Sequence, residues 1–262
     1  MTSLSVVIPA RNEAENMARV LEDLNATIST LKGHVVEVIV VDDGSTDDTA
    51  RIAETMGARV IRNTSRRHGK GVALRLGFDA ATGDLLAMMD ADYSHRAEEL
   101  PRFLDALADG SVGLVIGSRV IGGSEEYTHI RALGNVFLSA TLGLCTGRYL
   151  SDALNGFKVF RRSIYQEFPF NAANFEIEIE IIANTLRSGY RIIEVLSHER
   201  ARAGGEAKSR VIRHGTRFLL RILFEGAKGV KPAPGRQRTP DDGPRAHPAL
   251  SQSAEALELP GR

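Results

Sequence analysis

The sequence predicts an α/β fold in which helices flank a central, mostly parallel β-sheet. Short apolar segments such as residues 35–41 alternate with longer segments whose apolar residues have helical spacing, such as 14–31. The strand segments are almost continuously hydrophobic, as expected for strands buried on both faces. Because a helix between two strands carries the chain back across the sheet, this alternation favours parallel strands.

The first half of the chain, about residues 1–118, has the regular alternation. Strands are expected at residues 4–8, 35–41, 58–61, 85–89 and 112–116, with Pro9 ending the first. Helices are expected at 14–31, 46–56, 70–81 and 97–108, with Ser45 or Thr46 capping the second.

The second half, about residues 119–230, has a less regular pattern. The glycines Gly117, Gly122 and Gly123 predict a mobile loop. Helices are expected at 130–145, 175–187 and 211–228, strands at 156–160 and 190–196, and a polar loop at 198–209. Residues 231–262 contain six prolines and few apolar residues, which predicts a disordered tail after a single domain spanning 1–230.

Composition narrows the class of protein. The 33 basic and 33 acidic residues balance, so the chain has no global signature of nucleic-acid binding. The single cysteine, Cys145, cannot form an intramolecular disulfide and indicates a reducing, cytoplasmic compartment. No signal peptide pattern opens the sequence, and no apolar stretch is long enough to span a bilayer.

An apolar strand at residues 85–89 runs directly into Asp90-Ala91-Asp92. Side chains two apart on an extended strand point to the same side, so both carboxylates are expected to face one space. Like charges at that separation repel unless a cation lies between them or one carboxylate stays protonated, and Mg²⁺ or Mn²⁺ prefers such oxygen ligands. The alternative is that these carboxylates only cap the following helix.

Polar clusters follow two more of the predicted strands, at residues 9–13 and 42–45. In an open parallel sheet, ligands bind beyond the carboxyl ends of the strands, and helix N-termini there can receive anions. Asp42 or Asp43 can accept hydrogen bonds from a base or ribose, although a simple turn and helix cap is the alternative. Lys70, in His68-Gly69-Lys70-Gly71, can reach a phosphate, but the spacing is not that of a P-loop.

Four motifs in order resemble family 2 glycosyltransferases, which have a GT-A fold and use nucleotide-diphosphate sugars. They are residues 5–13 (SVVIPARNE), residues 40–47 (VVDDGSTD), Gly69-Lys70-Gly71 and Asp90-Ala91-Asp92. Residues 117–119 (GSR), 152–158 (DALNGFK) and 202–208 (RAGGEAK) are also similar to the dolichol-phosphate mannose synthase branch. The resemblance implies a GT-A-type, Rossmann-like sheet with a nucleotide-binding half and an acceptor-side half.

The resemblance also implies roles for individual residues. Asp90 and Asp92 would hold Mg²⁺ or Mn²⁺ against the diphosphate, and Arg202 would close over it with Lys208 nearby. The nucleoside pocket would be lined by Pro9, Arg11, Glu13, Val41 and Asp43. The acceptor's phosphate would face Arg119, Arg131 and Asn135.

The expected reaction is therefore inverting transfer of a hexose to a polyprenyl (dolichyl) phosphate. Charge develops on the leaving diphosphate, where a divalent cation and a guanidinium stabilise it. A phosphate acceptor is already ionised near neutral pH, whereas a soluble hydroxyl acceptor, the main alternative, needs a general base. Asp152 is the candidate base by analogy, and a structural aspartate is its other interpretation. A sugar nucleotidyltransferase is a further alternative, although the loop at residues 9–13 lacks the glycines typical of that class.

Residues 208–228 combine basic side chains with a compact apolar block. A helix of this kind suits a membrane interface near anionic headgroups, which would make the protein peripheral at the inner face of the membrane. Packing on the core or in a dimer interface is the alternative.

Overall fold

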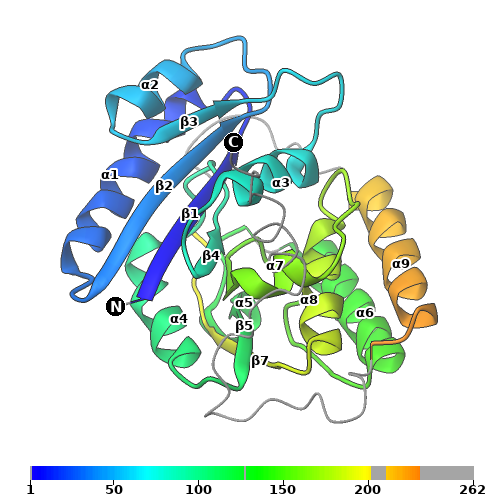
Figure 1. The fold of residues 1–262 in the computed structure, drawn as a ribbon. Helices are drawn as coiled ribbons and strands as arrows, with labels where there is room; N and C mark the ends of the chain where they lie inside the picture. Colours follow the sequence, from blue (N-terminus) through cyan, green and yellow to red (C-terminus); the bar gives the residue numbers. More distant parts are fainter. Residues whose placement is uncertain (1, 127, 202–210, 231–262) are drawn as a thin grey trace, which may run out of the picture.

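The computed structural model describes residues 2–126, 128–201 and 211–230, with side chains from residue 214 onward in the last range. One seven-stranded sheet runs through the molecule in the order β3-β2-β1-β4-β6-β5-β7 (Figure 1). Its strands are β1 (Thr2–Ala10), β2 (His34–Asp42), β3 (Arg59–Arg62), β4 (Leu85–Met88), β5 (Val112–Ser118), β6 (Lys158–Arg161) and β7 (Arg191–Leu196). Pro9 does not end β1, because it stays in register with Val41 of β2.

The predicted mostly parallel sheet is confirmed, with one reversal. β6 runs antiparallel to both β4 and β5, whereas the other neighbouring strands are parallel. The reversal arises because the chain leaves the end of β5, makes a long excursion through α5 and α6, and returns at the same end of the sheet to begin β6.

The helices largely follow the predicted spans. They are α1 (Ala14–Thr30), α2 (Thr49–Thr55), α3 (Lys70–Ala80), α4 (Leu100–Leu107), α5 (Arg119–Gly122), α6 (His129–Thr146), α7 (Arg162–Glu167), α8 (Ile177–Arg187) and α9 (Val211–Ala227). A 3₁₀ turn at Ala97–Glu99 precedes α4. The short helices α5 and α7 were not predicted, and the expected glycine loop instead places Gly117 in β5 and Gly122 at the end of α5.

The predicted cap of α2 is wrong. The helix begins at Thr49, and neither Ser45 nor Thr46 caps it. Both bind the loop after β1 instead: the backbone N–H of Asn12 donates to Ser45 Oγ (3.0 Å), and the N–H of Thr46 donates to Asn12 Oδ1 (2.8 Å). These contacts fasten together the loops that follow β1 and β2.

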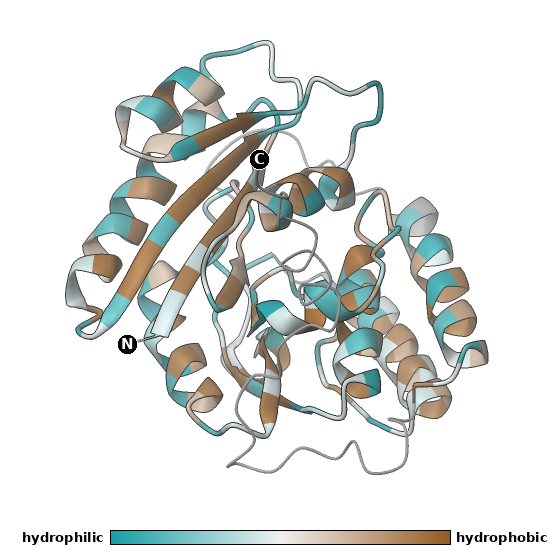
Figure 2. Cartoon of the chain, in the orientation of Figure 1, coloured by the Kyte–Doolittle hydropathy of each residue, from teal (hydrophilic) through white to brown (hydrophobic). Residues whose placement is uncertain are grey.

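The sheet has a hydrophobic core on each face. Along β1, Val6 and Ile8 pack on one side with α1 and α4, whereas Val7 packs on the other with α3 and α8. The strands are largely brown in the hydropathy colouring of Figure 2, as burial on both faces requires. This two-sided burial fixes the positions of the strand ends, where the polar loops lie.

Helices α6 and α9 pack against each other at the edge of the molecule opposite β3 (Figure 1). Two arginines of α9, Arg217 and Arg221, point toward the protein. Arg221 pairs with Glu180 (2.7 Å) and Glu225 (3.0 Å), and Arg217 lies 3.8 Å from Glu176. These two arginines therefore anchor α9 to α8, which favours packing on the core, one of the two interpretations that the sequence left open for this helix.

Two predicted segments fall outside the described residues. They are residues 202–209 of the expected polar loop and the expected tail at 231–262. The bounds of the single domain remain a prediction.

Replacing Arg221 with Met should lower the free energy of unfolding by on the order of 3 kcal/mol. The reason is that Glu180 and Glu225, whose side chains are 3% and 2% exposed, each lose a cationic partner. Chemical denaturation followed by circular dichroism measures the loss. Arg217→Met is the matched control, because its ion pair is longer and its side chain is 37% exposed, and we expect a loss below about 1 kcal/mol. Equal losses in the two variants would contradict the anchoring role of Arg221.

Candidate functional site

A cavity of about 470 Å³ lies beyond the carboxyl ends of β1, β2 and β4. This volume falls in the range of small-molecule sites. Its other walls come from α6, α8 and the N-terminal part of α9. The cavity thus joins the regular first half of the chain to the second half.

Most of the predicted site residues meet in this cavity. Those that line it are Pro9, Arg11, Glu13, Asp43, Lys70, Asp90, Asp92, Arg119, Arg131 and Asn135. Two do not reach it: Val41 is fully buried inside β2, and Asp152 is fully buried behind Arg119. Arg202 and Lys208 lie outside the described residues.

The loop after β2 separates the roles of its two aspartates. Asp42 accepts a hydrogen bond from the backbone N–H of Ser45 (2.9 Å) and shapes the turn. Asp43 lines the cavity and accepts hydrogen bonds from the Asn63 amide (2.6 Å) and the backbone N–H of Gly69 (2.7 Å). These donors, together with His68 Nδ1 at 3.1 Å, hold the Asp43 carboxylate in place and leave one lone pair that can accept from a ligand.

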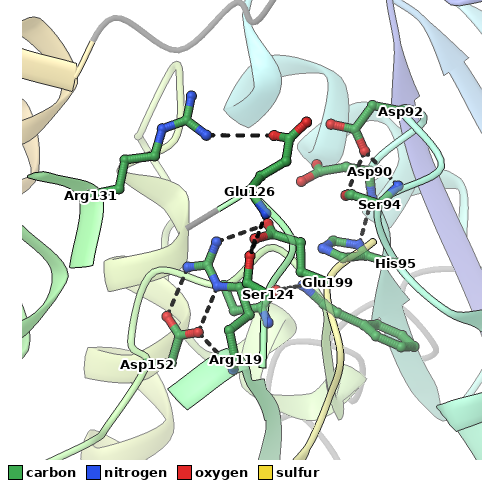
Figure 3. A network of polar contacts seen from close by, with 12 residues as sticks. Asp90, Asp92, Ser94, His95, Arg119, Ser124, Glu126, Arg131, Asp152 and Glu199 are labelled. Carbon is green, nitrogen blue, oxygen red and sulfur yellow. Dashed lines mark hydrogen bonds and ion pairs between the residues drawn. The ribbon is translucent and has the colours of Figure 1, made fainter. Parts of the chain in front are cut away.

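The sequence suggested that Asp90 and Asp92 lie on an extended strand, but the structure does not place them on one. β4 ends at Met88, and both residues belong to the loop that follows it. The two carboxylates nevertheless lie next to each other on one side of the cavity (Figure 3). Convergence therefore comes from the shape of the loop.

Local hydrogen bonds and one unusual backbone angle fix that loop. Tyr93 has φ of +67°, a left-handed conformation that is uncommon for a bulky residue and turns the chain back sharply. Ser94 then donates to Asp92 Oδ1 from its hydroxyl (2.6 Å), and the N–H of Asp90 donates to His95 Nδ1 (3.2 Å). His95 stacks on Phe157, so the aromatic core supports the turn.

A buried lysine connects this loop to α8. Lys70 Nζ lies 2.7 Å from Asp90 Oδ1 and 3.0 Å from Glu178 Oε1. Burial alone would lower the pKa of Lys70, but the attraction of Asp90 and Glu178 outweighs it and raises the pKa above its ordinary value. Lys70 therefore stays charged and compensates both carboxylates.

A second buried lysine supports the same part of the cavity. Lys158 of β6 is fully buried and donates to the backbone carbonyl of Asn155. Burial lowers the pKa of Lys158 to about 8, although nearby Glu178 favours the charged form. Its hydrogen bond holds the turn at Asn155-Gly156, which lies against Asp90.

The second half of the chain contributes an arginine held by two carboxylates. Arg119 makes a bidentate pair with Asp152 (2.7 and 2.9 Å) and donates to Glu199 (3.0 Å), as Figure 3 shows. Asp152 also accepts from the backbone N–H of Arg119 (3.0 Å). Asp152 is thus engaged in positioning Arg119, which favours the structural interpretation of this aspartate over that of a general base.

Two further predicted residues lie on α6. Arg131 is about one-third exposed and lies 3.6 Å from Glu126, a contact drawn in Figure 3. Asn135 donates from its amide nitrogen to the carbonyl of Ser151 (3.2 Å), while its Oδ1 has no hydrogen-bond partner among the described residues. Of the two, Arg131 offers the cation that suits an anionic ligand.

Sequence reasoning missed several residues of this cavity, including Glu178, Glu199 and Phe175. Glu178 lies in a segment, residues 175–187, for which the sequence predicted a helix and no site residue. Its burial at 1% exposure was the missing fact. An acidic residue within an otherwise buried helix is the signal that could have indicated it.

Replacing Gly156 with Ala should disturb the Asp90 loop. A Cβ there would lie 2.4 Å from Asp90 Oδ2 and 2.9 Å from Lys70 Nζ, so both must move. We expect the free energy of unfolding to fall by about 1–3 kcal/mol, measured by chemical denaturation. Gly134→Ala is the control, since this cavity residue of α6 has no described atom within 4 Å of an added Cβ. An unchanged stability of Gly156→Ala would refute the tight packing.

Comparison with known proteins agrees with this geometry. Residues 5–168 match the family described as glycosyl transferase family 2. A dolichol-phosphate mannosyltransferase from Pyrococcus furiosus is 32% identical over 235 residues, which cover 85% of this chain and 64% of that protein. A dolichyl-phosphate hexose transferase from Haloferax volcanii is 31% identical, with coverage of 77% and 84%. The chain thus spans less than two thirds of the Pyrococcus relative.

Among solved structures, a glucosyl-3-phosphoglycerate synthase from Mycobacterium tuberculosis is similar with a TM-score of 0.68 and 26% identity. The match covers 89% of this chain and 82% of that one, which was crystallised with Mn²⁺, UDP-glucose and phosphoglyceric acid. The predicted GT-A fold is confirmed by this likeness. With the family match and the Haloferax relative, it establishes that the chain belongs to glycosyltransferase family 2.

Proposed function

We propose that this chain is a metal-dependent, inverting glycosyltransferase that moves a hexose from a nucleotide-diphosphate sugar to a polyprenyl phosphate. One observation carries the proposal: Asp90 and Asp92 share a single cavity with the loops after β1 and β2 and with Arg131 of α6. A donor and an acceptor could therefore meet there. The names of the Pyrococcus and Haloferax relatives support a lipid-phosphate acceptor.

The residues present fit a hard divalent cation. The carboxylates of Asp90 and Asp92 both face the cavity and offer oxygen ligands. In the described part of the chain, no group of three or more His, Cys, Asp or Glu side chains is placed to hold a metal ion. Mg²⁺ and Mn²⁺ suit such an incomplete set, because they are commonly held by one or two carboxylates together with substrate phosphates. Asp90 and Asp92 would hold the ion, and it would offset the charge that develops on the leaving diphosphate.

Residues of the first half would bind the donor. Arg11, Glu13 and Asp43 come from two loops that are hydrogen-bonded to each other, so they form a preorganised pocket for the nucleoside. Pro9 lines the same wall, and Val41 would support it from inside the sheet. Lys70, at the start of α3, would stabilise the diphosphate next to Asp90.

We propose that residues following Ala201, where the described range ends, complete the diphosphate site. Ala201 donates from its backbone N–H to Glu125 (2.8 Å), and Glu199 lines the cavity, so the chain leaves the described region at the site itself. This position supports the proposal that Arg202 closes over the diphosphate with Lys208 nearby.

The acceptor's phosphate would face Arg131, with Arg119 and Asn135 behind it. A phosphate is already largely ionised near neutral pH and attacks the anomeric carbon without losing a proton to the protein. The engagement of Asp152 by Arg119 is consistent with this, since no free base is needed. Attack from the face opposite the diphosphate inverts the anomeric carbon.

A soluble hydroxyl acceptor is the alternative, and the solved neighbour crystallised with phosphoglyceric acid favours it. That reaction needs a general base at the cavity.

We also propose that the protein acts in the cytoplasm, peripherally at the inner face of the membrane. In the ranges 2–126, 128–201 and 211–230, none of the helices has the length and apolar character needed to cross a bilayer. We propose that residues 208–228, which combine basic and apolar side chains in the sequence, make the contact with the membrane.

Asp92→Asn should weaken metal-dependent donor binding by about 100-fold, because it removes one of two charges that hold the cation. The thermal midpoint should change little, since the Asn oxygen can still accept from Ser94. Calorimetric titration of nucleotide-diphosphate sugar with and without Mn²⁺ measures the effect. Asp105→Asn, on the exposed side of α4, is the control. Undiminished Mn²⁺-dependent affinity in Asp92→Asn would argue against the metal role.

The reaction itself is tested by incubating the protein with GDP-mannose, UDP-glucose, UDP-N-acetylglucosamine or a dTDP-sugar. Each donor is offered undecaprenyl phosphate in detergent or 3-phosphoglycerate, with Mg²⁺ or Mn²⁺. We expect a glycosylated lipid phosphate and free nucleoside diphosphate from at least one donor. Transfer only to 3-phosphoglycerate would establish the hydroxyl alternative, and release of pyrophosphate would indicate nucleotidyl transfer.

A further inference from the structure

The chain segment that follows β7 lies against the loop of the two cavity aspartates. We call residues 197–201 the strap. The backbone N–H of Arg200 in the strap donates to the carbonyl of Ser94 (2.9 Å), two residues after Asp92. The strap therefore contacts the loop of Asp90 and Asp92 directly, although the two segments are distant in the sequence.

The strap is also paired with the loop that leads into α6. Glu199 donates from its backbone N–H to the carbonyl of Gly123 (3.1 Å), and the N–H of Glu125 donates to the carbonyl of Glu199 (3.0 Å). Ser124 and Glu199 form an isolated parallel bridge. These bonds hold the strap in place independently of the contacts that Arg200 makes.

The side chain of Arg200 adds two contacts beside the aspartate loop. Its guanidinium lies over the ring of Tyr93, with Cζ 4.6 Å from the ring centroid, and it pairs with Asp23 of α1 (2.8 Å). The Arg200 side chain is only 22% exposed. Tyr93 also packs against the hydrophobic core beside α1 and α4, so contacts with both the core and Arg200 fix its ring.

Tyr93 is the residue whose backbone gives this loop its shape. Its φ of +67° costs free energy in any residue other than glycine, and such a conformation persists only when the surroundings enforce it. Arg200 reaches this turn twice, through the Tyr93 ring and through the carbonyl of Ser94. The strap thus supplies a constraint that the hydrogen bonds inside the loop do not.

We propose that Arg200 is a positioning residue that holds the left-handed turn at Tyr93 and so keeps Asp92 next to Asp90. The two carboxylates then face the cavity in the arrangement that accepts a divalent cation. The metal-binding part of this proposal rests on the proposed function, whereas the constraint on the loop rests on the contacts alone.

The sign of the effect on cation binding separates positioning from simple electrostatics. Removing the positive charge of Arg200 from beside this loop would, by charge alone, strengthen the binding of a cation. Loss of positioning weakens that binding instead, because Asp90 and Asp92 no longer converge. A lower cation affinity after removal of a cationic side chain is therefore the signature of the positioning role.

The test measures two properties of the full chain carrying Arg200→Met. Mn²⁺ binding is followed by the electron paramagnetic resonance signal of the free ion, and hydrogen exchange of residues 90–95 is followed by mass spectrometry without metal. We expect Mn²⁺ affinity to fall about tenfold, as loss of a ring contact and its constraint predicts, and exchange of residues 90–95 to accelerate. Arg200→Lys keeps the charge but not the planar group over the ring, so it should lose less affinity. Arg51→Met is the control, because Arg51 pairs with Asp48 (2.9 Å) and lies outside the cavity.

Tyr93→Gly provides a rescue that the strain argument requires. Glycine adopts a positive φ without steric cost, so the turn no longer depends on Arg200. In the Tyr93→Gly background, Arg200→Met should therefore change Mn²⁺ affinity less than about twofold, as a double-mutant cycle measures.

Unchanged or stronger Mn²⁺ binding in Arg200→Met would overturn the proposal, and so would an equal loss with Tyr93 or glycine at position 93. Unchanged exchange of residues 90–95 would also overturn it, because the loop would then keep its shape without the Arg200 side chain. Circular dichroism verifies that each variant is folded. If the wild type itself binds no Mn²⁺, that result counts against the proposed function, and the exchange measurement alone then decides the role of Arg200.

Discussion

The site depends on one buried charge, the ammonium of Lys70 between Asp90 and Glu178. Taking carboxylates out of water is costly unless a cation compensates them at close range. Lys70 begins α3, Asp90 follows β4 and Glu178 lies on α8, so a single compensated cluster joins three elements. The regular first half and the irregular second half of the chain meet at this point.

Much of the fold followed from the sequence because its causes are local. Continuous apolar segments predicted the strands, and helical spacing predicted α1, α3, α6, α8 and α9 to within a few residues. The direction of β6 was not predictable, because its residues have the same apolar pattern in either direction and only the preceding excursion decides it. The start of α2 was missed because Ser45 and Thr46 bind Asn12, a contact between distant segments.

The site was predictable where a motif lies at a strand end. Asp43, Asp90 and Asp92 all line the cavity, although the loop geometry that brings the last two together was not foreseen. Val41 and Asp152 were placed in the site by resemblance, and burial excludes both from the cavity wall. Glu178 was missed because its importance comes from tertiary burial and from its distant partner Lys70.

The reversed strand β6 has a consequence for how the two halves are coupled. Because β6 starts where its neighbours β4 and β5 end, the turn that precedes β6 lies at the edge of the sheet beside the cavity. Gly156 lies at that turn, in contact with Asp90, and Lys158 is the first residue of the strand. A slip of this strand by one residue would turn each of its side chains to the other face of the sheet. It would also move Gly156 away from Asp90 and bring there a residue whose Cβ does not fit. The alignment of one short central strand thus sets the spacing between the two halves of the catalytic edge.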